Sequence, residues 1–482
     1  MISKSWSKLR DLSSKKKLEL QKKSGKKFKI QKNNFIKTKK IDFDFSRHHV
    51  NESILETLIY FAKESKLIQK RESLYSGKEN ALHVILRGGQ KGKIVSKHPL
   101  EQEINRERER MLFFAEDLNQ GKVCGWSNKP IKDIIVFGFG GSILASKLVF
   151  HALRSKFCIS KINICFFSNP DGIDLNNHLD NINAEQTLFL IQSKSLSTPE
   201  IDILVKIATN WLKEKSCPDN LLQNQFVVIT SNIKKAKELN FKDQKTFKIW
   251  TDVGGRFSIW SSMGLTLAIL IGTKKFYDFL DGAREMDDHF YNTEPKKNIP
   301  IISALIAIWN RSFLNLPSQL ISNYSSQLDY LVPYIQQIEM ESLGKSVNQD
   351  DEICKYHTGG VVWGGSGIEG QHSYYQFIHQ GTIIVPVDFF GLKKDNTTIH
   401  NDFIVKNIKA QADSLAIGDG TINFKGNRPS SIYWLSEISP NSLGYLLSLL
   451  EHKVFTMGSI WNLNPFNQPG VELGKKMLKT IK

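Results

Sequence analysis

Residues 252–258 combine residue types that suit the binding of a negatively charged ligand. Gly254 and Gly255 have no Cβ, so the backbone can approach a ligand closely there. Arg256 follows at once, and its guanidinium is a permanently charged, planar fork of donors for oxyanions. An apolar segment comes next, which predicts a buried helix whose first turn offers N–H groups to the same ligand. The alternative is a tight turn that holds a salt-bridged arginine.

A second candidate anion site lies at residues 138–142, after an expected strand. Three glycines and Ser142 precede a helix that should begin near Ile143. Glycines and a hydroxyl at a helix N-terminus suit a phosphate group. The signal is weak, because the segment has neither the G-x-G-x-x-G spacing of dinucleotide-binding folds nor the G-K-[ST] ending of a P-loop.

A third segment, residues 193–200, has four hydroxyl side chains and a lysine around a proline. Proline is favoured in the first turn of a helix, so a helix should begin here. A capping box between Ser197 and Glu200 would explain part of the segment without any ligand. It would leave the run Ser193-Lys194-Ser195 unexplained, which favours a site for a phosphate ester.

In the C-terminal half, residues 333–343 predict a helix that ends at Gly344, because glycine is common just after a helix end. Gln337 and Glu341 are four residues apart and therefore share one face of this helix. Glu341 lies in the last turn, where the helix dipole disfavours a carboxylate unless a cation such as an arginine lies nearby. A carboxylate held in this way can act as a general base. The simpler alternative is a surface glutamate.

Two further side chains toward the C-terminus can exchange protons. His372 ends a segment with glycines at 367 and 370, which reads as a loop. Lys475 follows a turn-forming run at residues 467–470. A structural histidine and a surface lysine are the simpler interpretations of these two residues.

The expected secondary structure places these segments at strand and helix ends. Short apolar runs that alternate with amphipathic helices predict parallel sheets covered by helices, and such sheets bind ligands at the carboxyl ends of their strands. The expected strands of the first α/β unit are residues 134–137, 162–167, 187–191 and 226–229, with a helix at 201–212. Those of the second unit are residues 359–363, 382–387 and 431–435, and residues 51–122 read as helical.

The positive charge of the chain is concentrated at one end. The chain has 482 residues and a formal net charge of +17; residues 1–40 hold fifteen Lys and Arg against two acids, which is +13. Such a run predicts a flexible or weakly helical arm, with binding of nucleic acid or acidic surfaces as an alternative role. Five Cys without metal-ligand spacing indicate a reducing, cytoplasmic compartment and no zinc site. No apolar run is long enough to span a membrane.

Taken together and in order, these segments resemble the glucose-6-phosphate isomerase (phosphoglucose isomerase) family. The similarity runs from about residue 133 to the C-terminus. The motifs that carry it are S-N-P-D-G at 168–172, S-K-S-L-S-T-P-E at 193–200, D-V-G-G-R-F-S-I-W-S at 252–261, M-E-S-L-G-K-S at 340–346, G-Q-H-S-Y-Y-Q-F-I-H-Q-G-T at 370–382, F-K-G-N-R-P-S at 424–430 and P-G-V-E-L-G-K at 469–475.

The resemblance implies an α/β fold. It predicts two sugar-isomerase (SIS) type domains, with mainly parallel five-stranded sheets flanked by helices, plus a helical N-terminal region. The expected division is a flexible basic arm at 1–45, a helical segment at 46–122, a first domain at 123–290, and a second domain with a C-terminal helix at 291–482.

The same resemblance implies exchange of glucose 6-phosphate and fructose 6-phosphate through a cis-enediol, without a metal or cofactor. Glu341 matches the base that moves a proton between C1 and C2, and Arg256 matches the cation that stabilises the enediolate. His372, expected from the neighbouring subunit of a homodimer, and Lys475 match the pair that opens the sugar ring. The positions that match phosphate, sugar and other substrate contacts are Ser142, Ser193, Lys194, Ser195, Thr198, Glu200, Gly255, Gln337 and Gln468.

The chain also departs from the family motifs. Ile143 and Ala145 replace an acid and a glycine of G-G-S-D-L-G, and Pro199 lies within a changed T-F-T-T-Q-E-T. Gly365 stands where W-G-E-P-G has its acid. Every expected reacting side chain is present, which predicts an active enzyme. The alternative is a sugar-phosphate-binding regulatory protein with weak or no turnover.

Overall fold

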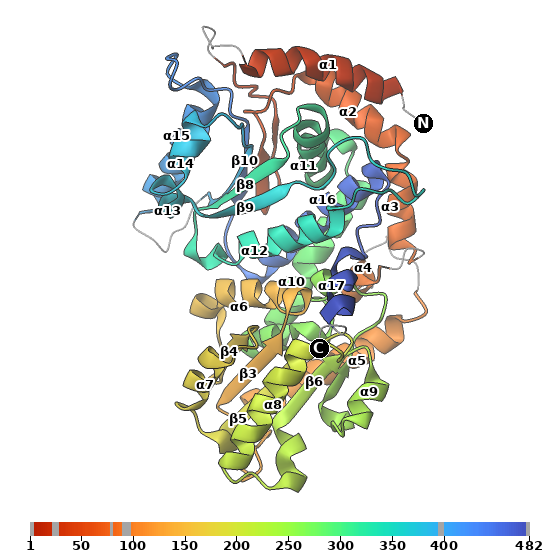
Figure 1. The fold of residues 1–482 in the computed structure, drawn as a ribbon, viewed down its shortest axis with the longest axis vertical. Helices are drawn as coiled ribbons and strands as arrows, with labels where there is room; N and C mark the ends of the chain where they lie inside the picture. The colour runs from red at the N-terminus through yellow and green to blue at the C-terminus, as the bar shows by residue number, and fades with distance from the viewer. Residues whose placement is uncertain (1–3, 22–27, 78–80, 89–97, 394–399, 479–482) are drawn as a thin grey trace. The chain divides into compact units, whose positions relative to one another are not determined.

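The computed structural model describes residues 4–21, 28–77, 81–88, 98–393 and 400–478 (Figure 1). The chain forms two compact units. Residues 75–281 form one, here called the central unit, and residues 1–74 with 282–482 form the other, here called the terminal unit. The expected helical segment 46–122 is therefore divided between the two units. Among the residues just listed, no helix is both long and apolar enough to cross a membrane.

A five-stranded parallel sheet lies at the centre of the central unit. Its strand order is β4-β3-β5-β6-β7, and every neighbouring pair is parallel. The strands are β3 (Asp133–Gly138), β4 (Asn163–Phe167), β5 (Thr187–Gln192), β6 (Phe226–Thr230) and β7 (Thr246–Lys248). The four expected strands of this unit are confirmed. β7 was not expected, because three residues are too few to give a periodic signal.

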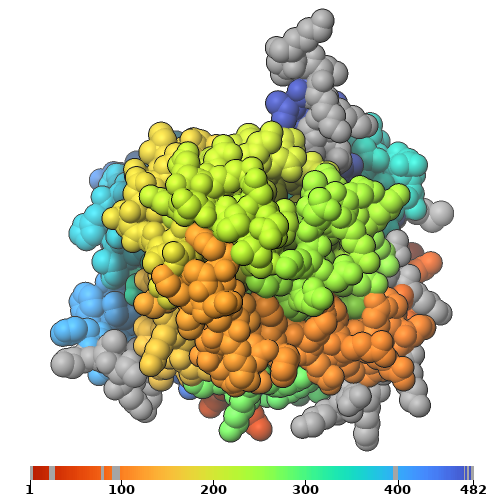
Figure 2. Space-filling view, turned by 90° about the horizontal axis from the view of Figure 1, so that it is seen from below, coloured from red at the N-terminus to blue at the C-terminus, as the bar shows by residue number. Residues whose placement is uncertain are grey.

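Helices accompany this sheet in the central unit, because buried parallel strands need helices to cover them. They are α4 (His83–Leu86), α5 (Glu101–Asn119), α6 (Leu144–Phe157), α7 (Ile173–Leu179), α8 (Pro199–Glu214), α9 (Ile233–Glu238) and the first part of α10 (Leu265–Asn292). Phe189 and Phe226 of the sheet share one hydrophobic core with Leu204 of α8. At the β7 edge of the sheet, Arg110 of α5 donates to the carbonyl of Thr246 (2.5 Å). Figure 2 shows the orange and green segments of the central unit side by side on one face.

The sheet of the terminal unit has six strands in the order β1-β2-β11-β10-β8-β9. The strands are β1 (Phe35–Ile36), β2 (Ile41–Asp44), β8 (Ser318–Asn323), β9 (Val361–Ser366), β10 (Val387–Leu392) and β11 (Ser430–Leu435). β11, β10, β8 and β9 are parallel to their neighbours, whereas β2 pairs with β11 and β1 with β2 in antiparallel fashion. Two of the six strands, β1 and β2, come from the N-terminal arm and extend one edge of a four-stranded parallel part, so the sheet has six strands where five were expected.

Helices make up most of the rest of the terminal unit. They are α1 (Lys4–Gln21), α2 (Glu52–Glu64), α3 (Leu67–Tyr75), the last part of α10, α11 (Ile299–Ile308), α12 (Leu331–Gln336), α13 (Gly367–Gln371), α14 (Tyr375–Gln380), α15 (Asn401–Ile417), α16 (Pro440–Trp461) and α17 (Gly470–Leu478). On one face, Phe389 and Ile432 pack against Ile408 of α15. α11 and α16 contact each other, and almost all of their residues are buried.

The described part of the expected flexible arm is folded onto the terminal unit. α1 packs against α2, with Leu9 fully buried and the Trp6 ring 4.6 Å from that of Phe313. Ile41 and Phe43 of β2 are fully buried as well. The arm was expected to be solvated because of its charge, and this expectation is wrong. Apolar residues lie among its lysines, and the rest of the terminal unit covers them, so a high charge does not by itself keep the segment solvated.

One strand prediction for the terminal unit is wrong, and one strand was missed. Residues 382–387 were expected as a strand, but β10 begins only after Pro386, which has no N–H for a ladder hydrogen bond. β8 was not expected at all. The first and last residues of this strand, Ser318 and Asn323, are polar, so the segment lacks the apolar run of a buried strand.

Candidate active site

Three of the segments selected from the sequence meet at the carboxyl end of the sheet in the central unit. The 3-10 turn Gly140–Ser142 follows β3, and the 3-10 turn Gly255–Phe257 contacts it directly. A Cβ added to Gly141 would lie only 2.4 Å from the backbone nitrogen of Arg256. Glycine is therefore required at 141, because it lets the turn that carries Ser142 touch the turn that carries Arg256.

Lys194, just after β5, belongs to the same group. Its Nζ donates to the carbonyl of Thr251 (2.7 Å). Burial lowers the pKa of Lys194, the Asp252 carboxylate opposes this shift, and the positive charge of Arg256 adds to it. Charges influence one another in this way only at short range. Lys194 and Arg256 thus form a pair of cations suited to bind a phosphate or an oxyanion.

Arg256 is almost completely buried, with 2 % of its surface exposed, and its guanidinium lies 5.3 Å from the centre of the Phe257 ring. The buried helix expected directly after it does not begin there. The chain first makes a second 3-10 turn, Ser262–Gly264, and α10 starts at Leu265. Any N–H groups offered to a ligand beside Arg256 therefore come from a short turn and not from a long helix.

The hydroxyl-rich segment after β5 is held in a defined conformation. The Ser193 hydroxyl accepts a hydrogen bond from the N–H of Leu196 (3.2 Å), and the Ser197 hydroxyl donates to that of Ser195 (2.7 Å). Leu196 has φ +50°, a left-handed conformation that is uncommon for a leucine. Such conformations persist where the surroundings enforce them, often at ligand sites.

The start of α8 decides between the two interpretations of this segment. The N-cap residue is Thr198, with Pro199 in the first turn, and no side chain caps the helix. A capping box between Ser197 and Glu200 is therefore absent from this described segment, and Ser197 bonds to Ser195 instead. Glu200 is half-buried in the first turn, where the helix dipole favours a carboxylate. The Thr198 hydroxyl is consequently not used as a cap.

In the terminal unit, Gln337 and Glu341 lie at the two ends of a single π-helical turn that continues α12. Such turns are rare and often occur at functional sites. Helical structure ends before Gly344, as expected, although it begins at Leu331 and not at residue 333. The N–H of Gly344 donates to the carbonyl of Met340 (2.9 Å), and a Cβ at 344 would lie 2.5 Å from that oxygen.

A buried ion cluster supports this turn, and the sequence analysis did not find it. Glu339 accepts from Arg311 (2.6 Å) and from Lys453 (2.7 Å), and all three side chains are about 2 % exposed. Burial alone would raise the pKa of Glu339, but the charges of Lys453 and Arg311 outweigh it and hold the pKa at about 2. Burial raises the pKa of the neighbouring Asp388. Charged residues inside apolar helices are a general sign of buried pairs, but the sequence does not say which of them pair.

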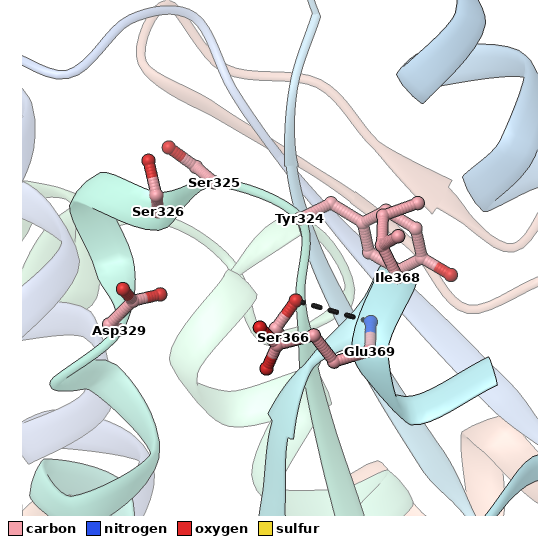
Figure 3. A pocket seen from close by; sticks show the side chains of 7 residues that line it. All are labelled: Tyr324, Ser325, Ser326, Asp329, Ser366, Ile368 and Glu369. Carbon is pink, nitrogen blue, oxygen red and sulfur yellow. Dashed lines mark hydrogen bonds between the residues drawn. The ribbon is translucent and has the colours of Figure 1, made fainter. Parts of the chain in front are cut away.

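His372 follows α13, a short helix where a loop was expected, because Ser366 caps it by accepting from the N–H of Glu369 (3.4 Å). The His372 side chain is exposed. A cavity of about 350 Å³ lies beside α13, at the carboxyl ends of β8 and β9 (Figure 3). Its lining residues come from the segments after these two strands: Tyr324, Ser325, Ser326, Asp329, Ser366, Ile368 and Glu369.

The remaining expected residues lie at the C-terminal end. Gln468 is half-buried in the loop before α17. Lys475 lies within α17, and its side chain is outside the described part of the structure. Hydrogen bonds from Lys345 to Ser342 and Asn467 hold the loop of Gln468 next to the end of the Glu341 turn. Across the described residues, no three His, Cys, Asp or Glu side chains gather as potential metal ligands.

Comparison with known proteins identifies the family. A sequence model described as Phosphoglucose isomerase matches residues 44–482, nearly the whole chain. The chain belongs to the phosphoglucose isomerase family. The arm before residue 44 lies outside the match.

Individual members of the phosphoglucose isomerase family show the extent of the similarity. The chain is 38% identical over 479 residues to a glucose-6-phosphate isomerase of Francisella tularensis, covering 92% of this chain and 88% of that protein. It is 35% identical over 464 residues to one of Paraburkholderia phytofirmans, covering 91% and 85%. The crystal structure of a glucose-6-phosphate isomerase from Chlamydia trachomatis superposes with a TM-score of 0.88 at 27% identity, covering 99% of this chain and 95% of that one.

Proposed function

We propose that this protein is an enzyme that interconverts glucose 6-phosphate and fructose 6-phosphate. The observation that carries the proposal is the match of residues 44–482 to the phosphoglucose isomerase family. The relatives from Francisella and Paraburkholderia are named glucose-6-phosphate isomerases. Nothing in these comparisons favours the alternative, a regulatory protein that binds the sugar phosphate without turning it over.

The phosphate-binding step is assigned to the central unit. Lys194 supplies charge, and the hydroxyls of Ser142, Ser193, Ser195 and Thr198 supply hydrogen bonds. Support comes from the short Lys194–Thr251 contact and from the helix start at Thr198, whose hydroxyl does not cap α8. Glu200, Gly255, Gln337 and Gln468 are assigned to further contacts with substrate. Binding at the phosphate, away from the reacting carbons, anchors the sugar for the chemical step.

The chemical step is a proton transfer between adjacent carbons. In the aldose-to-ketose direction, the Glu341 carboxylate takes the proton from C2, and the electron pair moves to form the enediolate. Negative charge develops on oxygen, and the fixed guanidinium of Arg256 stabilises it. Glu341 then returns the proton to C1 while the hydroxyl proton of O2 passes to O1, which leaves the carbonyl at C2, so that one carboxylate serves both carbons.

Ring opening has to precede proton transfer, because a closed pyranose has no carbonyl group. One group removes the proton of the C1 hydroxyl while another delivers a proton to the ring oxygen. His372 and Lys475 are assigned to this pair, with His372 donated by the second copy in a homodimer. The exposed position of His372 on the terminal unit is compatible with such donation. A residue shared between copies makes the dimer the active form.

The proposal has a direct test. Purified protein is mixed with fructose 6-phosphate, and the appearance of glucose 6-phosphate is followed with a coupled dehydrogenase. We expect turnover without added metal. Binding of fructose 6-phosphate in calorimetry with no turnover would instead support the regulatory alternative.

Polyanion binding through residues 1–40 is a second candidate function. The observation that favours it is the way α1 is folded: Leu9 and Leu20 are buried, whereas Lys4, Lys8 and Lys15 are exposed. The buried apolar residues are not available for a membrane, which favours nucleic acid over a lipid surface.

The five cysteines are all unpaired, which supports the proposal that the protein works in the reducing cytoplasm.

A further inference from the structure

Lys345 joins two segments of the terminal unit that carry proposed active-site residues. Its Nζ donates to three backbone carbonyls: Ser342 (2.7 Å), Asn464 (2.6 Å) and Asn467 (2.9 Å). Ser342 directly follows Glu341, and Asn467 directly precedes Gln468. The same ammonium group therefore bonds to the end of the π-helical turn and to the loop that leads into α17.

The number of bonds and the charge of the Lys345 ammonium group both strengthen this link between the two segments. An ammonium group has three donors, which matches its bonds to three separate carbonyls. Its charge also lies at the C-terminal end of the helix, where the dipole favours a cation and disfavours the carboxylate of Glu341. A hydrogen bond that involves a charged donor is stronger than one between neutral groups.

The backbone of Lys345 is itself held in place. Its N–H donates to the carbonyl of Leu343 (2.8 Å), and its carbonyl accepts from the Thr358 hydroxyl (2.8 Å). The N–H of Gly359 donates to the carbonyl of Leu343 as well (2.9 Å). The side chain thus extends from a fixed base, which allows it to fix the loop at 464–468 in turn.

We propose that Lys345 is a positioning residue for the isomerisation, which sets the Glu341 turn relative to the loop of Gln468 and to α17, the helix that contains Lys475. The inference rests on the proposed function. Lys345 acts through the backbone of these segments and needs no contact with substrate. A proton-transfer base and a ring-opening group must each be placed to within about 1 Å, since an error of that size costs about a hundredfold in rate.

The test removes the ammonium group of Lys345 and compares the effect with that of the same substitution at a similar lysine elsewhere in the unit. Lys345→Met keeps the length of the side chain and removes its donors. Lys70→Met is the matched control, because Lys70 Nζ donates to the carbonyl of Ser459 (2.8 Å) and to Asn462 Oδ1 (3.2 Å), and so also ties a helix to the end of α16. Both variants lose charge-assisted bonds of half-buried lysines, but the two bonds of Lys70 just described go to residues at the end of α16 and not to the Glu341 turn.

We expect Lys345→Met to lower kcat by about 10- to 100-fold. KM for fructose 6-phosphate should change by less than about threefold, because the phosphate contacts are assigned to other segments. Lys70→Met should keep kcat within about twofold. Lys345→Arg, which keeps the charge, should recover part of the loss. Limited proteolysis should cleave Lys345→Met, but not Lys70→Met, within residues 464–470.

Unchanged kcat in Lys345→Met would overturn the inference, and so would an equal loss of kcat in the Lys70 control. If Lys345→Met does not fold, Lys345→Gln, which keeps a polar head group but loses the charge, decides the matter: kcat equal to that of the unmodified protein together with unchanged proteolysis would refute the positioning role. Failure of the proposed function gives a different result, because the unmodified protein would then show no turnover at all.

Discussion

Replacing Glu339 with glutamine should destabilise the protein by removing the carboxylate from a buried ion cluster. In the structure, Glu339 pairs with Arg311 and Lys453, all of them buried. In the variant, Asp388, which lies 3.6 Å from Lys453, is the carboxylate that remains in the cluster. Removing one partner of a buried ion pair lowers the free energy of unfolding by about 3–5 kcal/mol, because the remaining charge stays buried without compensation.

The pKa of Glu339 gives an independent magnitude. The ordinary value of 4.5 falls to about 2 in the folded protein, despite a burial effect in the opposite direction. At about 1.4 kcal/mol per pH unit, the charged form gains about 3 kcal/mol from its surroundings. Because the folded-state pKa lies below the unfolded-state value, this stabilisation is complete above about pH 5 and is lost as the pH falls toward 2.

Urea unfolding of Glu339→Gln, followed by circular dichroism, measures the loss. We expect about 3 kcal/mol at pH 7 and a smaller difference from the unmodified protein as the pH falls from 5 to 3. The matched control is Glu103→Gln, which breaks a surface pair with Lys248 in which both side chains are 41% exposed, and it should cost less than about 1 kcal/mol. A loss no larger than that of the control, or one independent of pH, would refute the reasoning.

Three further predictions concern the site and the arm. Mixing inactive Glu341→Gln with His372→Ala and allowing subunits to exchange should restore activity, up to about a quarter of that of the unmodified protein, because one site of each mixed dimer is then intact; no gain would show that His372 acts within its own chain. Gly141→Ala should lower kcat at least about tenfold, because its Cβ would collide with the backbone of the Arg256 turn, whereas Gly365→Ala, with nothing within 4 Å of the new Cβ, should have little effect in the same assay. Replacing the exposed lysines of residues 4–15 with glutamine should reduce salt-dependent retention on a heparin column, and unchanged retention would exclude the arm as a polyanion site.

The strands that the sequence predicts correctly are those with uninterrupted apolar runs. β3 and β5 are buried on both faces, so every residue contributes to the signal. β8 is equally buried, but Gln319 in it is polar and is satisfied by Arg311, eight residues away in sequence and beside it in space. β2 was assigned to a charged arm, although pairing with β11 buries it. Both failures arise because tertiary partners decide whether a polar or charged segment can be buried.

In the candidate site, too, features set by local sequence could be predicted, whereas features set by distant partners could not. Glycines, hydroxyls and a proline at strand and helix ends are local signals, and the helix start at Pro199 and the helix end before Gly344 follow from them. The Glu339 cluster and the three bonds of Lys345 join residues that are distant in sequence. No spacing rule reports such pairs, so they had to be found in the structure.

The most direct test of the central claim is the turnover of Glu341→Gln. Fructose 6-phosphate is supplied at saturation, glucose 6-phosphate is measured with a coupled dehydrogenase, and binding of the substrate is measured separately by calorimetry. Loss of a general base should lower kcat by about 10²- to 10⁴-fold while the substrate still binds, and Glu352→Gln, an exposed glutamate of the same unit, should retain full turnover. Normal turnover in Glu341→Gln would contradict the assignment of this carboxylate as the group that carries the proton between C2 and C1.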